Sequence, residues 1–226
     1  MAEHEHNKDN TKRKILDAAL REFGGRGYGE ASTNRICRVA GISKGLLFHH
    51  FGSKEKLFSA VLEQCLRDFQ VFTQPEGAGK DCFCLFYRRR TQFFSEHPWH
   101  YAVIMSLFDG AAGQLESLHA MRVRFEQEKE QRLSGCLQSC ALREGVSRKD
   151  ALELIAAMSA HLQEKYLKGG AAAGGSPELT ERFMRDYDHM LSMLLHGILQ
   201  APEGGQGCGI ADPCPLAQKS PANGRV

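Results

Sequence analysis

The chain has 226 residues, which is enough to bury one sizeable hydrophobic core or a small and a medium-sized one. Its 29 Lys and Arg side chains almost balance its 27 Asp and Glu side chains, which excludes a strongly basic or strongly acidic protein. The N-terminus lacks the apolar segment of a signal peptide, and no apolar run reaches about 18 residues, the length of a membrane-spanning helix. We therefore expect a soluble cytoplasmic protein with no membrane partner.

The positive charge is concentrated near the N-terminus. Residues 1–60 contain 11 basic and 7 acidic side chains, a balance of +4, and the remaining 18 basic and 20 acidic side chains give −2. Within residues 31–60 one acid, Glu55, accompanies five basic side chains, which are Arg35, Arg38, Lys44, Lys54 and Lys56. This distribution favours an anionic partner for the region, although five such charges on a protein surface are more often only solvated.

Apolar residues recur with the period of an α-helix along most of the chain, so we predict an all-α fold. Residues 1–10 are polar and are expected to form a disordered tail. A first helix follows, and we expect it to end at the Gly24-Gly25 pair and Gly27. Three further helices are predicted to begin at capping residues, which are Thr33, Ser43 and Ser53.

A break at "TQPEGAGK", residues 73–80, separates these helices from a second group. This group is predicted to comprise five longer helices, at about residues 81–96, 99–108, 115–143, 148–168 and 177–200. Ser147 with Asp150 fits the start of the fourth of them, and Pro177 fits the start of the fifth. Residues 201–226 are rich in Gly and Pro and poor in apolar side chains, so we expect a disordered tail there.

The segment "GISKGLLFHHFGSKEKLF", residues 41–58, predicts a very short helix preceded by a glycine turn. A helix of so few residues is marginal by itself. Two short helices joined by "AGIS" fit a helix-turn-helix, in which a glycine permits the sharp turn. At 100° per residue, Leu47 and Phe51 lie on the buried side of the second helix, and Gly45 and His49 lie on the opposite side.

Gly45 is unexpected on a solvent-facing helix, where it costs about 1 kcal/mol relative to alanine. The lack of a side chain would let another surface approach the backbone closely, and the major groove of DNA is wide enough to admit a helix. One flank of this face carries Lys44 and Phe48, and the other carries Leu46 and His50. The segment therefore predicts a helix that reads duplex DNA.

The chain from about Thr11 to Phe69 resembles the DNA-binding domain of the TetR/AcrR family of bacterial transcription regulators. The matching stretches are "ILDAALREFGGRGYGEAST" and "NRICRVAGISKGLLFHHFGSKEKLF". The resemblance implies a helix-turn-helix DNA-binding domain at residues 11–58, with the motif itself at about 32–51. It also implies a larger helical domain at residues 59–200 that binds an effector and forms a dimer.

The resemblance further implies that the third helix enters the major groove and that Lys54 meets a phosphate. The implied contact residues are Thr33, Asn34, Ser43, Lys44, Gly45, Leu46, Phe48, His49 and Lys54. Phe48 departs from the family pattern because a tyrosine is usual there, and Leu46 stands where a small hydroxylic residue is common. Both changes suggest apolar contact with bases, such as a thymine methyl group; alternatively, both side chains pack against the first helix.

In the family the last two long helices pair with those of a second subunit, which implies a homodimer through residues 148–168 and 177–200. The apolar stripe of the last helix is wide enough for both a core and a partner, although it could also pack only internally. We expect such a dimer to bind a pseudo-palindromic DNA operator. We expect it to act as a repressor that an effector releases from DNA.

The region that holds the effector pocket in the family is rich in aromatic residues and methionine, which favours a small apolar or aromatic effector. The candidate pocket residues are Phe86, Phe93, Trp99, Met105, Met121, Phe125 and His161. Such a set is also typical of a plain hydrophobic core. The run Arg88-Arg89-Arg90 could supply polar contacts, but a charge run is by default a solvated surface.

Two alternatives use other chemistry. The eight cysteines could make a metal- or thiol-redox-responsive regulator, but none has the paired spacing of a structural zinc site, so we predict no metal and no cofactor. A helical enzyme is the remaining class, with His97 and His100 beside Glu96 as its best catalytic candidates. The chain has no nucleophile elbow, phosphate loop or metal-binding helix signature, so we do not expect an enzyme.

Overall fold

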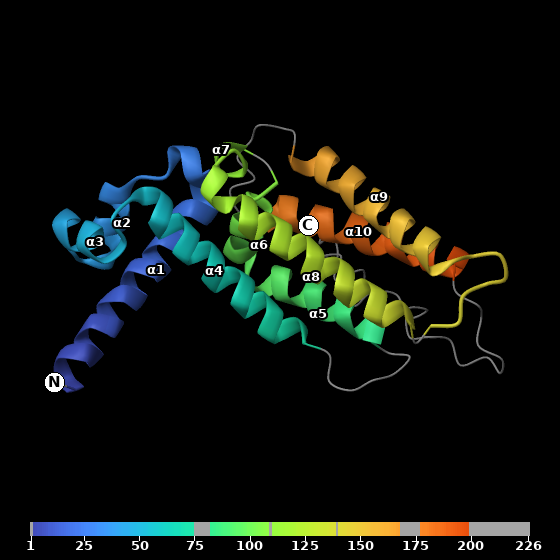
Figure 1. The fold of residues 1–226 in the computed structure, drawn as a ribbon. Coiled ribbons are helices and arrows are strands. Elements are labelled where there is room, and N and C mark those ends of the chain that lie inside the picture. Colours follow the sequence, from blue (N-terminus) through green and yellow to red (C-terminus); the bar gives the residue numbers. More distant parts are fainter. Residues whose placement is uncertain (1, 75–81, 109, 139, 168–176, 199–226) are drawn as a thin grey trace, which may run out of the picture.

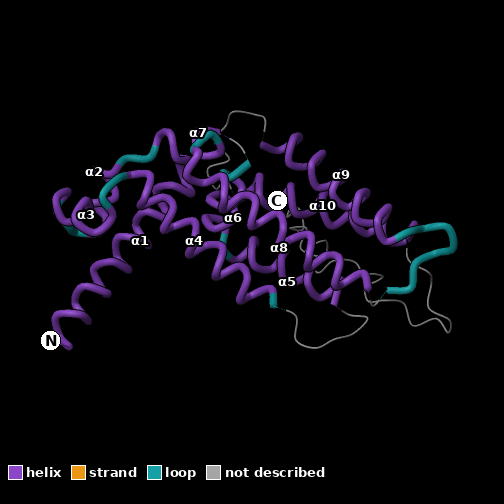
Figure 2. The backbone as a smooth tube through the Cα atoms, viewed as in Figure 1, coloured by secondary structure: helices purple, strands orange, loops and turns teal. Residues whose placement is uncertain are grey.

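In a computed structural model of the chain, the structure describes residues 2–74, 82–108, 110–138, 140–167 and 177–198 (Figure 1). Within these ranges the regular structure is helical and no β-strand is present (Figure 2). The predicted all-α fold is therefore confirmed. The predicted C-terminal tail and the glycine-rich segment before Pro177 lie outside the described residues.

The N-terminal helices form a group at one end of the molecule (Figure 1). They are α1 (Ala2–Glu30), α2 (Thr33–Ala40), α3 (Lys44–Phe51) and the first turns of α4 (Lys54–Thr73). Their core consists of almost completely buried apolar side chains, among them Ile15, Phe23, Ile36, Leu47, Leu57 and Phe58. Because α4 continues for 20 residues, it also reaches the second group of helices.

The second group contains seven short and long helical elements among the described residues. They are α5 (Cys82–Glu96), α6 (Pro98–Met105), α7 (Gly110–Gly113), the 3-10 turn η1 (Glu116–Leu118), α8 (His119–Gln138), α9 (Arg148–Leu167) and α10 (Pro177–Ile198). The five long helices predicted from the sequence are all present. The one predicted at 115–143 is divided into η1 and α8, and α7 was not predicted.

The predicted start of α9 is confirmed. Ser147 Oγ accepts a hydrogen bond from the backbone N–H of Asp150 at 3.1 Å, and the Asp150 carboxylate accepts one from the backbone N–H of Ser147 at 3.2 Å. This reciprocal arrangement is a capping box, which satisfies backbone donors that the first turn of a helix leaves without partners.

Helix α1 differs from the prediction at its N-terminus. It begins at Ala2, so residues 2–10, which were expected to be disordered, are helical in the structure.

The glycine pair of α1 also has another role than the predicted one. The φ and ψ angles leave the helical region at Gly27, which has φ 70° and ψ 168°, so the predicted helix end is confirmed there and not at the Gly24-Gly25 pair. The close packing of Trp99 of α6 explains why residue 24 is a glycine, because a Cβ there would lie 3.0 Å from both Cα and Cβ of Trp99. The glycine pair therefore lets α6 approach α1 closely instead of ending the helix.

Helix α6 joins the two groups of helices, since it packs against both α1 and α4. A second contact links η1 to the start of α4, where the Ser117 hydroxyl donates a hydrogen bond to the Glu55 carboxylate. The N-terminal group is thus held to the second group through α4, α6 and η1. Across the described ranges, we find no helix with the length and apolarity that spanning a membrane requires.

Candidate DNA interface and effector cleft

A carboxylate of α1 fixes the position of α2. Glu22 Oε1 accepts a hydrogen bond from the backbone N–H of Ser32 at 2.8 Å and another from Arg35 Nε at 2.7 Å. Ser32 is the N-cap residue of α2 and makes no side-chain capping bond, so the predicted capping role of Thr33 is wrong and Thr33 is the first helical residue. Instead, the charge-assisted hydrogen bonds that the Glu22 carboxylate accepts hold the start of α2 in place.

The turn between α2 and α3 depends on a glycine. Gly41 has φ 67° and ψ 36°, in the left-handed region, and its N–H bonds to the carbonyl of Arg38 at 3.4 Å. Ser43 then caps α3, as predicted, because its Oγ accepts from the N–H of Leu46 at 3.2 Å. Gly52, with φ 74°, follows the last residue of α3. The cap and the two glycines limit α3 to eight residues.

The two faces of α3 differ sharply in exposure. Leu47 is completely buried and Phe51 is 8% exposed, as their angular positions predict. The exposed residues of α3 are Lys44, Gly45, Leu46 and His49. This helix lies at the end of the molecule that is far from α9 and α10 (Figure 1). The described part of the chain therefore presents a short helix outward, anchored only by its inner side.

Nothing in the described part of the chain explains the missing side chain at Gly45. A Cβ there would meet only Ser43 Oγ, at 4.0 Å. Alanine would fit this position without strain and has the higher helix propensity. The glycine therefore indicates a requirement that lies outside the folded chain.

Phe48 has a packing role in the N-terminal core. Its side chain is half-buried and contacts the core cluster, and Lys44 Nζ lies 5.9 Å from the centre of its ring. Leu46 is more exposed, at 36%. Base contacts by Phe48 and Leu46 stay predictions, and for Phe48 the alternative of core packing has direct structural support.

The residues predicted to meet phosphates lie at helix N-termini. Thr33 and Asn34 begin α2, Ser43 caps α3, and Lys54 begins α4. Asn34 is exposed, whereas the Thr33 side chain is half-buried. Helix N-termini attract phosphate because their first N–H groups point outward and the helix dipole is positive there.

Lys54 has intramolecular partners at the end of α1. Its ammonium donates a hydrogen bond to the carbonyl of Gly29 at 3.2 Å and lies 4.8 Å from the centre of the Tyr28 ring. Burial lowers the pKa of Lys54, and the carboxylate of Glu22 partly counteracts this. The side chain therefore links α4 to α1, and a phosphate contact would be additional to this link.

A cleft lies among α4, α5, α8, α9 and α10, with Met105 of α6 contributing to its wall. Its cavity volume is about 60 Å³, and the space around it opens to solvent. Its apolar lining consists of Phe69, Phe86, Phe94, Met105, Phe125, Leu133 and Phe183. Its polar lining consists of Gln70, Arg90, Glu128, Lys129, Arg132, Ser159 and Tyr187.

The structure brings together part of the predicted effector set in this cleft. Three of the seven predicted residues line it, which are Phe86, Met105 and Phe125. Phe93 is buried beside the cleft, not in its lining, and its ring centre lies 4.7 Å from that of His97.

The other three predicted effector residues lie elsewhere. Trp99 covers Gly24 and Gly25 at the junction with α1. Met121 is half-buried in the first turn of α8, and His161 is exposed on α9. None of these three lines the cleft.

The polar side chains of the lining were not among the predicted effector residues, and Arg90 was considered only as part of a charge run that is by default solvated. The Arg90 guanidinium carbon lies 4.0 Å from the centre of the Tyr187 ring, whose hydroxyl is 3.0 Å from Ser159 Oγ. A signal was present in the sequence, because Arg90 lies four residues after Phe86 and four before Phe94. Residues four apart share a helix face, so Arg90 faces the same way as two aromatic residues.

The anchored short helix and its glycine turn define the class: the chain carries a helix-turn-helix at one end of an all-helical fold. Residues 15–61 match the family model described as "Bacterial regulatory proteins, tetR family". The repressor AcnR of Corynebacterium efficiens is 44% identical over 55 residues, which are 24% of this chain and 29% of that protein. The regulator UidR of Escherichia coli K12 is 44% identical over 54 residues, 24% of this chain and 28% of that protein.

A third relative, the repressor Rv1474c of Mycobacterium tuberculosis, is 36% identical over 66 residues, 29% of this chain and 35% of that protein. The chain thus matches about a third or less of the length of these curated relatives. The family model at residues 15–61 covers the helix-turn-helix and parts of the flanking helices α1 and α4.

Solved structures extend the similarity in fold to the second group of helices. CprB from S. coelicolor A3(2), described as a TetR family protein, has a TM-score of 0.66 at 17% identity, covering 94% of this chain and 99% of that one. A gamma-butyrolactone receptor (ArpA like protein) has a TM-score of 0.62 at 18% identity, covering 86% and 90%. At these identities the likeness shows the fold alone.

Residues 15–61 thus match the TetR family of bacterial transcription regulators by sequence, and most of the chain is similar to solved TetR-family proteins in fold. The matched relatives are described as transcriptional repressors or regulators.

Proposed function

We propose that the chain is a ligand-responsive transcriptional repressor that binds a pseudo-palindromic DNA operator as a homodimer. In this proposal a small, largely apolar effector enters the cleft and releases the protein from DNA. The matched relatives AcnR and Rv1474c are described as transcriptional repressors. The structural neighbour described as a gamma-butyrolactone receptor supports a response to a small molecule.

The exposed face of α3 is the observation that carries the proposal. It presents Lys44, Gly45 and His49 outward, on a helix that Leu47 and Phe51 fix from the inner side. A lysine and a histidine can donate hydrogen bonds to base edges or phosphates, and the glycine allows the backbone to come close to the groove. A face that only met solvent would not need the glycine.

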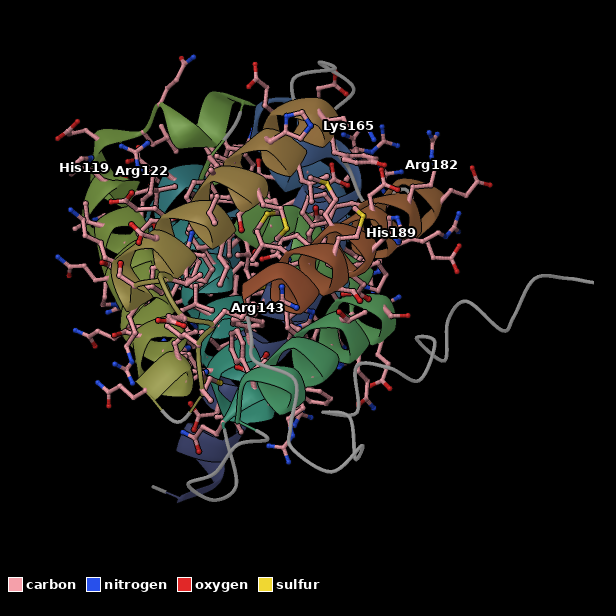
Figure 3. All side chains as sticks on the ribbon, turned by 90° about the vertical axis from the view of Figure 1, so that its right-hand side faces the viewer. His119, Arg122, Arg143, Lys165, Arg182 and His189 are labelled. Atoms are coloured by element: carbon pink, nitrogen blue, oxygen red, sulfur yellow. The ribbon has the colours of Figure 1, made fainter. Side chains whose placement is uncertain are left out.

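We expect α9 and α10 to contact a second copy of the chain. Figure 3 shows these two helices side by side, and Lys165 of α9 pairs with Asp186 of α10 at 2.6 Å. Leu154 on α9 is 49% exposed and Met193 on α10 is 56% exposed. Large apolar side chains at this level of exposure favour a partner surface. Pairing of these helices with those of a second copy would cover both residues in a four-helix bundle.

The metal- or thiol-responsive alternative has less support. Cys37, Cys65 and Cys136 are buried, and burial raises the pKa of the Cys65 thiol, which disfavours the reactive thiolate. In the described ranges no three His, Cys, Asp or Glu side chains are grouped so that they could hold a metal ion. Cys208 and Cys214 lie outside the described residues.

Selection of bound sequences from a pool of random duplexes tests the proposal. The wild-type chain should select a two-fold symmetric sequence. Lys44→Ala and His49→Ala should each change the preferred bases, whereas Lys54→Ala should weaken binding to all sequences and reduce the salt slope by about one unit. If Lys44→Ala and His49→Ala kept the base preferences of the wild type, α3 would not be the helix that reads the base sequence. If the wild type selected no sequence, specific DNA binding would be contradicted.

A further inference from the structure

The lining of the cleft is unusually cationic for an aromatic cavity. It includes three basic side chains, Arg90, Lys129 and Arg132, and one acidic side chain, Glu128. Ligand cavities are mostly apolar and contain a few polar groups that orient the ligand. A buried positive charge is costly unless an opposite charge or suitable acceptors accompany it. When Glu126, which pairs with Lys129, is also counted, the half-buried basic side chains exceed the acidic ones by one (3 − 2), and this excess suggests that the occupant brings negative charge.

The basic residues of α8 have partners at the edge of the cleft. Lys129 pairs with the carboxylate of Glu126 on the same helix. Arg132 donates a hydrogen bond to Oγ1 of the buried Thr73 at 2.8 Å. The acidic Glu128 accepts a hydrogen bond from Gln70 on α4. The hydrogen bonds of Arg132 and Glu128 connect α8 to α4 across one side of the cleft.

Arg90 is held in a different way, by aromatic rings. Its guanidinium carbon lies 4.0 Å from the centre of the Tyr187 ring and 5.6 Å from that of Phe94. Stacking engages the flat face of a guanidinium, whereas its N–H donors lie along its edges in a planar fork. This fork matches the geometry of a carboxylate, which can accept two parallel hydrogen bonds.

The Tyr187 ring that supports Arg90 is itself fixed. Ser159 Oγ donates a hydrogen bond to the carbonyl of Ile155 at 2.8 Å, so the contact of 3.0 Å between Ser159 Oγ and the Tyr187 hydroxyl uses the tyrosine proton. The tyrosine proton is therefore not available to an anion. Within this part of the cleft, Arg90 is the charged donor, with Phe86 and Phe183 in the apolar wall around it.

We infer that the effector is an amphipathic carboxylate, whose apolar body contacts the aromatic wall of the cleft and whose carboxylate is bound by Arg90. This inference rests on the proposed role of the cleft as effector site and adds the chemical class of the ligand. It distinguishes the effector from a neutral hydrophobic molecule, which would offer no carboxylate to the guanidinium of Arg90.

A matched set of three probes tests the inference with the full chain: 4-phenylbutyrate, 4-phenylbutanol and 4-phenylbutylamine. Titration calorimetry should show that the acid binds about tenfold or more tightly than the alcohol, because a hydrogen bond to a charged partner is among the stronger ones. The amine should bind more weakly than either. The acid should also lower the affinity of the chain for a selected operator duplex.

Substitutions in α5 test whether Arg90 is responsible for the preference for the acid over the alcohol. Arg90→Gln should reduce the affinity of the acid to about that of the alcohol, and Arg90→Lys should keep part of the preference because it retains the charge. Arg89→Gln is the matched control, since Arg89 is adjacent in sequence but does not line the cleft, and it should bind the acid like the wild type. Thermal unfolding of each variant checks that it is folded.

Equal binding of acid and alcohol, a preference for the amine, or no binding of any probe in the millimolar range would overturn the inference. A preference for the acid that persists in Arg90→Gln would overturn the role of Arg90. If the chain binds operator DNA but shows no preference for the acid, only the ligand class is wrong. If it binds no operator DNA at all, the proposed function itself fails.

Discussion

Gly45 lowers the stability of the folded chain relative to alanine, so its presence reflects a requirement of binding. Gly45→Ala should raise the free energy of unfolding by about 0.5–1 kcal/mol, because alanine loses less conformational freedom in a helix. It should also weaken binding to the operator, since the new methyl group stands where the groove would come closest. Urea denaturation and fluorescence anisotropy measure the two effects.

The control for this prediction is Gly135→Ala on α8, where a Cβ would also meet nothing within 4 Å. It should stabilise the chain by a similar amount and leave operator binding unchanged. If Gly45→Ala likewise left operator binding unchanged, the close approach of DNA to this residue would be ruled out.

His100 makes the stability of the chain dependent on pH. Burial between α4 and α6 lowers its pKa, and nearby His97 acts in the same direction, while the carboxylate of Asp68, 3.3 Å from Nε2, partly opposes them. With a folded-state pKa below 6.5, the unfolded chain takes up the proton first as the pH falls. The free energy of unfolding should therefore be highest above pH 6.5 and decrease below it.

Denaturation curves measured over a pH series check this dependence. His100→Gln should flatten the decrease, whereas the exposed His161→Gln should retain it. A decrease of equal size in both variants would assign the pH dependence to other groups.

At the scale of elements, α1 and α6 connect the two groups of helices, and Gly24 lets them pack closely. Gly24→Ala would place a Cβ 3.0 Å from Cα and Cβ of Trp99, and backbone atoms cannot move aside as a flexible side chain could. We expect a loss of about 1–3 kcal/mol in the free energy of unfolding, the usual cost of overpacking.

Gly25→Ala is the matched control for this substitution. Its Cβ would lie 3.4 Å from Cζ3 of Trp99, an ordinary contact, so the free energy of unfolding should change little. Chemical denaturation followed by the fluorescence of Trp99, the one tryptophan of the chain, compares the two variants. Equal stabilities would show that α6 does not depend on the glycine at residue 24.

The sequence predicted elements well where their signals are local. The period of the apolar residues located the long helices, and the capping residues Ser43 and Ser147 marked helix starts that the structure confirms. Gly24 was misread as a helix end because its reason is a contact with Trp99, which lies 75 residues away (99 − 24). Such contacts are not visible in a local pattern.

At the scale of the whole molecule, the cleft shows the same limit of sequence reasoning. Phe86 and Phe125 were recognised as candidates by residue type, but Phe93 and Trp99 have the same type and pack elsewhere. Arg90 belongs to the cleft because α10 places Tyr187 opposite it, which composition cannot reveal. Residue type predicted the character of the lining, and the packing of α5, α8 and α10 decided its members.

The central claim is that two copies of the chain bind DNA sequence-specifically through α3. Footprinting of the full chain on a duplex selected from the random pool tests it most directly. We expect two protected segments related by a two-fold axis, with centres separated by about one helical turn or more, and loss of both in Lys44→Ala under the same conditions. A single protected segment, protection without symmetry, or an unchanged pattern in Lys44→Ala would contradict it.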